Sequence, residues 1–192
     1  MPRALRLISL PALLLALASC TTNGGNTFLV ATKIILPTGL DLTTGLCLAP
    51  AFSPNSDETV FAFFGTDVPL KMGLVLENRL PAATKGEHSQ SNDFTTQSLV
   101  IRYESTGAAA INIQERTIAA QGYVPATGKS AAIADVVSLA DAATLNTQLG
   151  AEQYVRVNIH AVGKLNDGHT VQSSDYSFIV RRGAKSSICS AK

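Results

Sequence analysis

Residues 155–180 read VRVNIHAVGKLNDGHTVQSSDYSFIV, and they contain the two clearest strand patterns of the chain on either side of a turn. Apolar residues alternate with polar ones in both halves, which is typical of β-strands with one buried face. Asp167-Gly168, between the halves, favours a type I′ hairpin turn with these two residues at its centre. The segment therefore predicts an antiparallel β-hairpin.

The turn also predicts how the two strands pair. With Asp167 and Gly168 at the centre, the facing pairs are Val155 with Val180, Val157 with Phe178 and Ile159 with Tyr176. All six side chains then lie on one face of the hairpin. A slip of one residue would turn the apolar set of one strand to the opposite face, so the pattern itself supports this register.

The same register places His160 opposite Asp175 on the outer face of the hairpin. A carboxylate beside an imidazole can orient the ring for catalysis or for metal binding. More often a cross-strand pair on such a face is a modest contact, worth about 0.2–1 kcal/mol. We therefore expect the contact to be structural.

Shorter patterns of the same kind recur upstream of the hairpin. The candidate strands are 28–36, 59–65, 69–80, 94–104, 109–119 and 133–139, and the segments 81–93 and 122–130 are expected to be loops. One short helix is expected, with Asp141 as its cap and Gly150 at its end. Short strands, turn-rich connections and one helix predict an all-β fold, an antiparallel β-sandwich, with a closed barrel as the alternative.

The N-terminus carries a different pattern, that of a secretory signal peptide. Arg3 and Arg6 precede an apolar run from Leu7 to Leu17, which is followed by small residues and then by Cys20. The run is shorter than the roughly 20 residues of a membrane-spanning helix. An ordinary signal peptide with an incidental cysteine is one explanation, but Leu17-Ala18-Ser19-Cys20 resembles the bacterial lipobox at all four positions.

The lipobox resemblance implies cleavage between Ser19 and Cys20, with a diacylglycerol on the Cys20 thiol and a fatty acid such as palmitate on the new N-terminus. Several acyl chains anchor a protein far more firmly than one, because each buried methylene contributes about 0.8 kcal/mol. In lipoproteins of the Gram-negative type an Asp after the cysteine retains the protein at the inner membrane. Residue 21 is Thr, so the resemblance favours the outer membrane.

This interpretation divides the chain into a signal peptide (1–19), an acylated cysteine with a short tether (20–27) and a single β-domain (28–192). Removal of the signal peptide leaves 13 of the 15 basic residues against 14 acidic ones. A nearly neutral chain without a basic cluster argues against nucleic acid as a partner. The expected partners are the membrane, through the lipid anchor, and a protein of the envelope.

The cysteines support an oxidising compartment. If Cys20 carries lipid, Cys47 and Cys189 remain as a pair, which in an exported protein predicts a disulfide. Such a bridge would close a loop of more than 100 residues, worth roughly 4–5 kcal/mol in the chain-entropy model. Two free buried thiols are the alternative.

Motifs that would indicate catalysis or cofactors are weak. Gly128-Lys129-Ser130 ends like a phosphate-binding loop, but Tyr123 stands where that motif needs its first glycine, which argues against a nucleotide. His88, His160 and His169 lack the spacing of a metal site. Asn78, Asn92 and Asp93 lack the density of a calcium loop, and Asn78 is expected to satisfy backbone groups instead. We therefore expect no catalytic residues, no metal and no cofactor.

A broader resemblance covers about two-thirds of the chain. The stretches LVLENRL (74–80), NDF (92–94) and LVIRY (99–103), and then Asp167-Gly168, Ser173, YSF (176–178) and Cys189, look like uncharacterised bacterial lipoproteins with immunoglobulin-like sandwiches. The resemblance implies that fold but no activity. The function expected is that of a non-catalytic, lipid-anchored envelope lipoprotein, structural or protein-binding. The alternative is a small-ligand-binding exported module that uses the loops 81–93 and 122–130, and a hydrolase is the weakest possibility.

Overall fold

The computed structural model describes residues 28–37, 39, 43–44, 47–48, 61–66, 68–82, 92–106, 111–149 and 153–183. The predicted signal peptide, the tether and the C-terminal tail with Cys189 lie outside these residues. The described part contains nine strands and one helix, and the strands form a single curled sheet.

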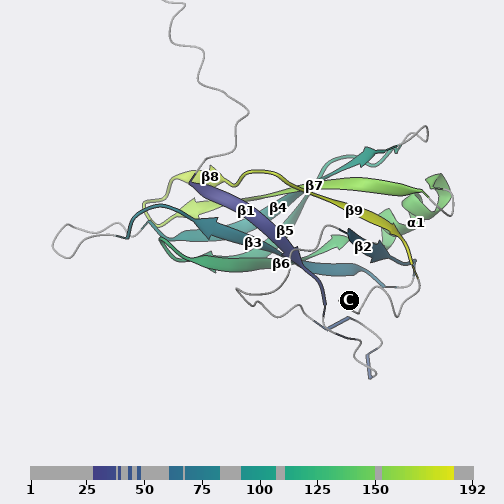
Figure 1. Cartoon of the computed structure of the whole chain (residues 1–192), viewed down its shortest axis with the longest axis horizontal. Helices are drawn as coiled ribbons and strands as arrows, with labels where there is room; N and C mark the ends of the chain where they lie inside the picture. Colours follow the sequence, from purple (N-terminus) through teal and green to yellow (C-terminus); the bar gives the residue numbers. More distant parts are fainter. Residues whose placement is uncertain are drawn as a thin grey trace, which may run out of the picture.

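The strands are β1 (Leu29–Ile35), β2 (Phe61–Phe64), β3 (Leu70–Asn78), β4 (Phe94–Ser105), β5 (Arg116–Val124), β6 (Lys129–Val137), β7 (Tyr154–Leu165), β8 (Thr170–Gln172) and β9 (Tyr176–Arg182). Helix α1 (Leu139–Gln148) joins β6 to β7. The order across the sheet is β1-β3-β6-β5-β4-β7-β9-β2, and β8 pairs with β7 beside β9. Figure 1 shows an elongated molecule with β8 toward one end and α1 at the other.

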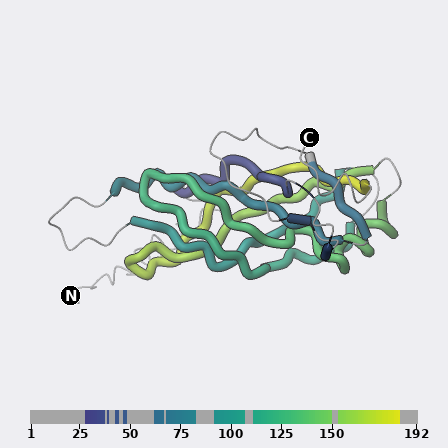
Figure 2. Tube along the Cα trace, turned by 90° about the horizontal axis from the view of Figure 1, so that it is seen from below, coloured from purple at the N-terminus to yellow at the C-terminus, as the bar shows by residue number. Residues whose placement is uncertain are grey.

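The sheet curls around one hydrophobic core, to which nearly all the strands contribute buried side chains. The curl brings the β1 edge back to the connection between β8 and β9. There the Ser174 N–H donates to the Leu29 carbonyl at 3.1 Å, and the Ala31 N–H donates to Ser174 Oγ at 3.0 Å. Seen from below, the β5–β6 and β7–β8 turns lie at the same end of the molecule (Figure 2).

The all-β class with one short helix is confirmed, but the expectation of a wholly antiparallel sheet is wrong. β2 runs parallel to β9, with Phe61 facing Ile179 and Phe64 facing Arg182. All other pairs of neighbouring strands are antiparallel. The sheet is therefore mixed, because a segment far upstream in the sequence adds to the edge of the C-terminal hairpin.

The predicted register of the C-terminal hairpin is confirmed, although its turn differs from the prediction. Val155 faces Val180, Val157 faces Phe178 and Ile159 faces Tyr176. Near the turn, however, Val162 faces Gln172, one residue out of that register. The connection from Ser173 to Asp175 contains one extra residue, which restores the predicted register in β9. This connection departs from the regular ladder as a β-bulge does.

The turn itself is longer than a type I′ turn. Leu165 N–H donates to the His169 carbonyl at 3.0 Å, and Gly168 N–H donates to the Leu165 carbonyl at 2.9 Å. Three residues therefore lie between the flanking pair. Of them only Gly168 has a positive φ, of 89°, whereas a type I′ turn needs positive φ at both central residues. The geometry is that of a tight turn closed by a left-handed glycine.

Helix α1 begins about one turn earlier than predicted, because Asp141 is not its N-cap. Ser138 is the N-cap, and Asp141 is the third helical residue of a capping box in which each side chain bonds the backbone of the other. The helix ends at Gln148, with Leu149 as its C-cap. Asp141 was predicted as the cap, but the serine three residues before it takes that position.

Candidate functional site

A polar hollow lies on the outer face of the sheet, and we call it the sheet-face hollow. Its volume is about 440 Å³, within the roughly 300–1,000 Å³ typical of small-molecule sites. It is lined by Val100 and Arg102 from β4, Glu115 just before β5, Asn158 and His160 from β7, Gln172 from β8, and Ser173 and Asp175 from the β8–β9 connection. Residues from across more than seventy positions of sequence thus meet at one place.

The floor of the sheet-face hollow follows from the pairing of β4 with β7. Val100 faces His160, and Arg102 faces Asn158. Side chains of facing residues point to the same side of a sheet, so these four lie together on the outer face while their neighbours Leu99, Ile101 and Ile159 are buried beneath them. The irregular connection after β8 supplies the wall that carries Asp175.

The predicted pair of His160 and Asp175 is formed. His160 Nδ1 lies 2.8 Å from Asp175 Oδ1, and Arg102 Nη2 lies 4.0 Å from Asp175 Oδ2. The Asp175 carboxylate therefore holds the imidazole through one oxygen and faces a guanidinium with the other. This arrangement directs the Nε2 side of the His160 ring away from Asp175.

Asn158 is the most buried of the polar side chains on the floor, with 8% of its surface exposed. Its Oδ1 accepts a hydrogen bond from the Ser177 hydroxyl. Its Nδ2 has no partner among the described residues, yet it is not one of the fully enclosed unpaired atoms there. The amide donors therefore retain contact with the hollow, which the residue lines.

Glu115 and Ser173 differ in whether their side-chain oxygens are free to bind a ligand. Glu115 is exposed and pairs with no residue of the described part of the chain. The Ser173 hydroxyl accepts from the Ala161 N–H at 3.0 Å and donates to the Ser174 carbonyl at 2.8 Å. The carboxylate is thus available to a ligand, whereas the hydroxyl is already used to stabilise the bulged backbone.

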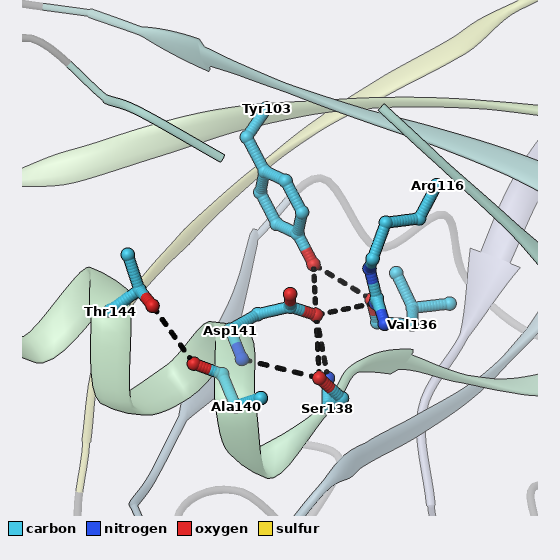
Figure 3. A network of polar contacts seen from close by, with 7 residues as sticks. All are labelled: Tyr103, Arg116, Val136, Ser138, Ala140, Asp141 and Thr144. Atoms are coloured by element: carbon cyan, nitrogen blue, oxygen red, sulfur yellow. Dashed lines mark hydrogen bonds and ion pairs between the residues drawn. The ribbon is translucent and has the colours of Figure 1, made fainter. Parts of the chain in front are cut away.

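A second polar cluster is buried at the base of α1 (Figure 3). Asp141 forms an ion pair with Arg116, lies 3.2 Å from the Tyr103 hydroxyl and accepts from the Ser138 hydroxyl at 2.8 Å. The Tyr103 hydroxyl also donates to the Val136 carbonyl at 2.9 Å. Burial, and then the charge of Asp141, raise the pKa of Tyr103 well above its ordinary value, against the opposing effect of Arg116. The cluster as a whole connects the start of α1 to β4 and β5, which is a structural role.

Most of the predicted lipoprotein features fall outside the described residues. Ser19, Cys20 and Cys189 lie outside the described residues. His88, which was considered as a metal ligand, lies outside them as well. Cys47 is described, half-buried and packed against the core. The Cys47–Cys189 disulfide and the lipidation of Cys20 therefore stay predictions.

The loops predicted as an alternative ligand site are only partly described. The segment 122–130 is mainly strand, since β5 extends to Val124 and β6 begins at Lys129, leaving a short turn. Asp93 Oδ1 accepts from the Ala126 N–H of that turn at 2.8 Å, and the Tyr123 hydroxyl donates to Asp93. Residues 83–91 of the other loop lie outside the described part, so a site between the two loops also stays a prediction.

Asn78, Asn92 and Asp93 serve the backbone in the described part of this region. Asn78 is buried, and its Nδ2 donates to the Asn92 carbonyl at 2.7 Å and to the Val124 carbonyl at 3.4 Å. The expectation that Asn78 satisfies backbone groups is confirmed. Within the described residues no three His, Cys, Asp or Glu side chains gather as a metal site would require.

The phosphate-loop-like segment forms a turn and the start of a strand. Gly128 closes the β5–β6 turn by donating to the Pro125 carbonyl at 2.9 Å, and Lys129 Nζ lies 3.1 Å from Glu77 Oε2 across the β3–β6 pair. With the Lys129 and Arg79 contacts, the pKa of Glu77 falls below its ordinary value. The lysine is thus engaged in a surface ion pair.

Sequence reasoning found one pair of the sheet-face hollow, His160 with Asp175, and missed the rest. The missing information was which strand lies on the other side of β7, because Arg102 and Asn158 become neighbours only through the β4–β7 pairing. The available signal was the polar outer face of each strand taken separately.

Comparison with known proteins adds no relative: no family model matches the chain, and no curated protein matches it. In the part of the chain that the structure describes, no helix has the length and apolar character needed to cross a bilayer.

Proposed function

We propose that this protein is a lipid-anchored lipoprotein of the bacterial envelope, positioned at the outer membrane, whose β-domain works by binding and not by catalysis. The observation that carries the proposal is the sequence Leu17-Ala18-Ser19-Cys20 after a charged and then apolar N-terminal stretch. Cleavage directly before Cys20 would leave its thiol at the new N-terminus, where it can carry lipid. The proposed β-domain is a sandwich of the immunoglobulin-like kind, supported by its all-β content and its single core.

The non-catalytic role is supported by the chemistry of the sheet-face hollow. A histidine oriented by an aspartate resembles part of a hydrolase site, which would need a nucleophile beside the imidazole. Among the described lining residues the one hydroxyl is that of Ser173, and both of its hydrogen bonds go to the backbone. The pair of His160 and Asp175 is better suited to holding a ligand than to activating a nucleophile.

A second candidate function, binding of a small ligand, is favoured by the sheet-face hollow itself. It combines sufficient volume with an almost buried amide and an unpaired carboxylate. In this form the ligand site lies on the sheet and not between the loops 81–93 and 122–130. It is compatible with the lipid anchor, because the anchor concerns where the protein is held and the hollow concerns what it holds.

Replacing Cys20 with alanine tests the anchor. We expect the wild-type protein expressed in a Gram-negative host to sediment with membranes, and the C20A variant to be released into the soluble fraction. The expectation follows because, in this proposal, several acyl chains supply the membrane affinity. The measurement is the membrane-bound fraction of each protein on immunoblots.

The matched control is Lys164→Ala, an exposed substitution on β7 that leaves the lipobox and all three cysteines intact. This variant should stay with the membranes. Retention of C20A at the level of the wild type would overturn the proposal, as would release of both variants together.

A further inference from the structure

The sheet-face hollow presents hydrogen-bond donors and acceptors side by side. The Asn158 Nδ2 and the Arg102 guanidinium are donors, whereas the Glu115 carboxylate accepts. His160, held through Nδ1 by Asp175, turns its Nε2 away from that carboxylate and adds a group that accepts when neutral and donates when protonated. A ligand that satisfies this set must itself both donate and accept.

The charges of the hollow argue against a simple ion as the ligand. Arg102 is balanced by Asp175 at 4.0 Å and by Glu104, whose Oε1 lies 3.5 Å from Arg102 Nε. Glu115 contributes one negative charge with no described partner. An anion would face two carboxylates in the lining, and a cation would face the guanidinium. Neither sign of charge is collected strongly enough to select an ion.

One side of the floor is apolar. Val100 faces His160 across the β4–β7 pair and carries no polar group of its own. The nearly buried amide of Asn158 lies on the same strand as His160, two positions away, and so on the same face. The hollow therefore places a small apolar surface beside fixed amide and carboxylate groups.

Neutral ligands with several hydroxyl groups match this arrangement. Each hydroxyl donates one hydrogen bond and accepts others, so adjacent hydroxyls suit a carboxylate and an amide or guanidinium placed together. The apolar face of a sugar ring, which consists of C–H groups, can pack against a valine side chain. We propose that the sheet-face hollow binds a sugar residue, with Glu115 accepting from its hydroxyls, Asn158 and Arg102 donating to them, and Val100 beneath the ring.

This inference rests on the ligand-binding role proposed above and names the class of ligand. The Asn158 amide is its strongest support, because its Nδ2 has no partner among the described residues and can donate to a ligand oxygen in the hollow that the residue lines. The aspartate-oriented His160 contributes a fixed direction, since a ring held at Nδ1 presents Nε2 in one place.

The test is a titration of the full chain, in detergent, with the methyl glycosides of glucose, galactose, mannose and N-acetylglucosamine. Nuclear magnetic resonance would follow the Asn158 side-chain amide and the His160 ring. We expect at least one glycoside to give saturable shifts of both groups, with a dissociation constant in the millimolar range that is ordinary for a single weak site.

Two variants identify the site. Glu115→Ala removes an exposed carboxylate that supports no other described residue, so the domain should stay folded while the dissociation constant rises about tenfold. Lys164→Ala is the control, because Lys164 is an exposed residue of β7 outside the hollow. Its dissociation constant should equal that of the wild type.

The outcomes separate this inference from the proposed binding role. Absence of saturable shifts with all four glycosides overturns the inference, and so does an unchanged dissociation constant in Glu115→Ala. Saturable shifts of the same groups with sodium phosphate or spermidine instead would also overturn it, while leaving a binding role for the hollow. The membrane fraction of the Cys20→Ala variant does not depend on any of these results.

Discussion

Gly163 is a single residue on which the packing of two central strands depends. It faces Thr96 across the β4–β7 pair, beside the point where the β4 register shifts. A Cβ at this position would lie 2.1 Å from the Thr95 carbonyl oxygen and 2.7 Å from Phe94 Cζ. One of these neighbours is backbone and the other is a fully buried ring. The close approach therefore requires glycine.

Gly163→Ala should lower the free energy of unfolding by about 1–3 kcal/mol or more, since overpacking forces buried groups to shift. Urea denaturation followed by circular dichroism measures the change. Gly39→Ala is the matched control, because its Cβ would meet Leu48 Cδ1 at an ordinary 3.5 Å. The explanation fails if both variants unfold at the same urea concentration as the wild type.

Asp141 also depends on its exact position, but its partners come from three elements. The sequence around it predicted a helix start, which is correct, yet its role differs from the prediction. Ser138 caps the helix. Asp141 forms an ion pair with Arg116 and contacts the Tyr103 hydroxyl in the buried cluster of Figure 3. A local pattern indicates that a helix starts here, whereas the ion pair between β5 and α1 depends on tertiary packing.

At the scale of elements, the hydroxyl of Tyr103 connects β4 to the start of α1. Tyr103→Phe keeps the ring and removes the hydrogen bond to the Val136 carbonyl and the contact with Asp141. We expect a loss of about 1–2 kcal/mol in the free energy of unfolding at neutral pH. Tyr154→Phe, at an exposed position, should have almost no effect.

The same variant predicts a pH dependence. Because the pKa of folded Tyr103 is raised above that of the unfolded chain, its contribution is complete below about pH 10 and is lost as the pH rises further. The stability difference between wild type and Tyr103→Phe should therefore stay constant from pH 8 to about pH 9 and narrow from there to about pH 11, roughly the range over which an unfolded tyrosine ionises. A difference that stays constant would contradict the burial of a neutral phenol.

The strands with clear alternation were predictable, because alternation is a local property of one segment. Their partners were predictable only where a short turn joins them, as in the C-terminal hairpin, whose register from Val155 to Ile159 is confirmed. The turn type was not predictable, since Asp167-Gly168 is compatible with more than one turn. The bulge after β8 then compensates for the one-residue change in register that the longer turn causes. Compensation of this kind leaves no local signal.

At the scale of the whole molecule, the parallel pairing of β2 with β9 and the return of the β1 edge to Ser174 determine how the sheet curls. Neither follows from a local pattern, because each joins segments more than a hundred residues apart. The sheet-face hollow has the same origin. Its position on the outer face leaves it accessible within the described part of the domain.

The central claim is that the domain is held at the membrane by lipid on Cys20. Mass spectrometry of the N-terminal peptide, from protein purified out of a Gram-negative envelope, tests it most directly. We expect a mature chain that begins at Cys20 and carries a diacylglycerol on its sulfur, with or without a further acyl group on its amino nitrogen. A mature N-terminus at any other residue, or an unmodified Cys20, would contradict it.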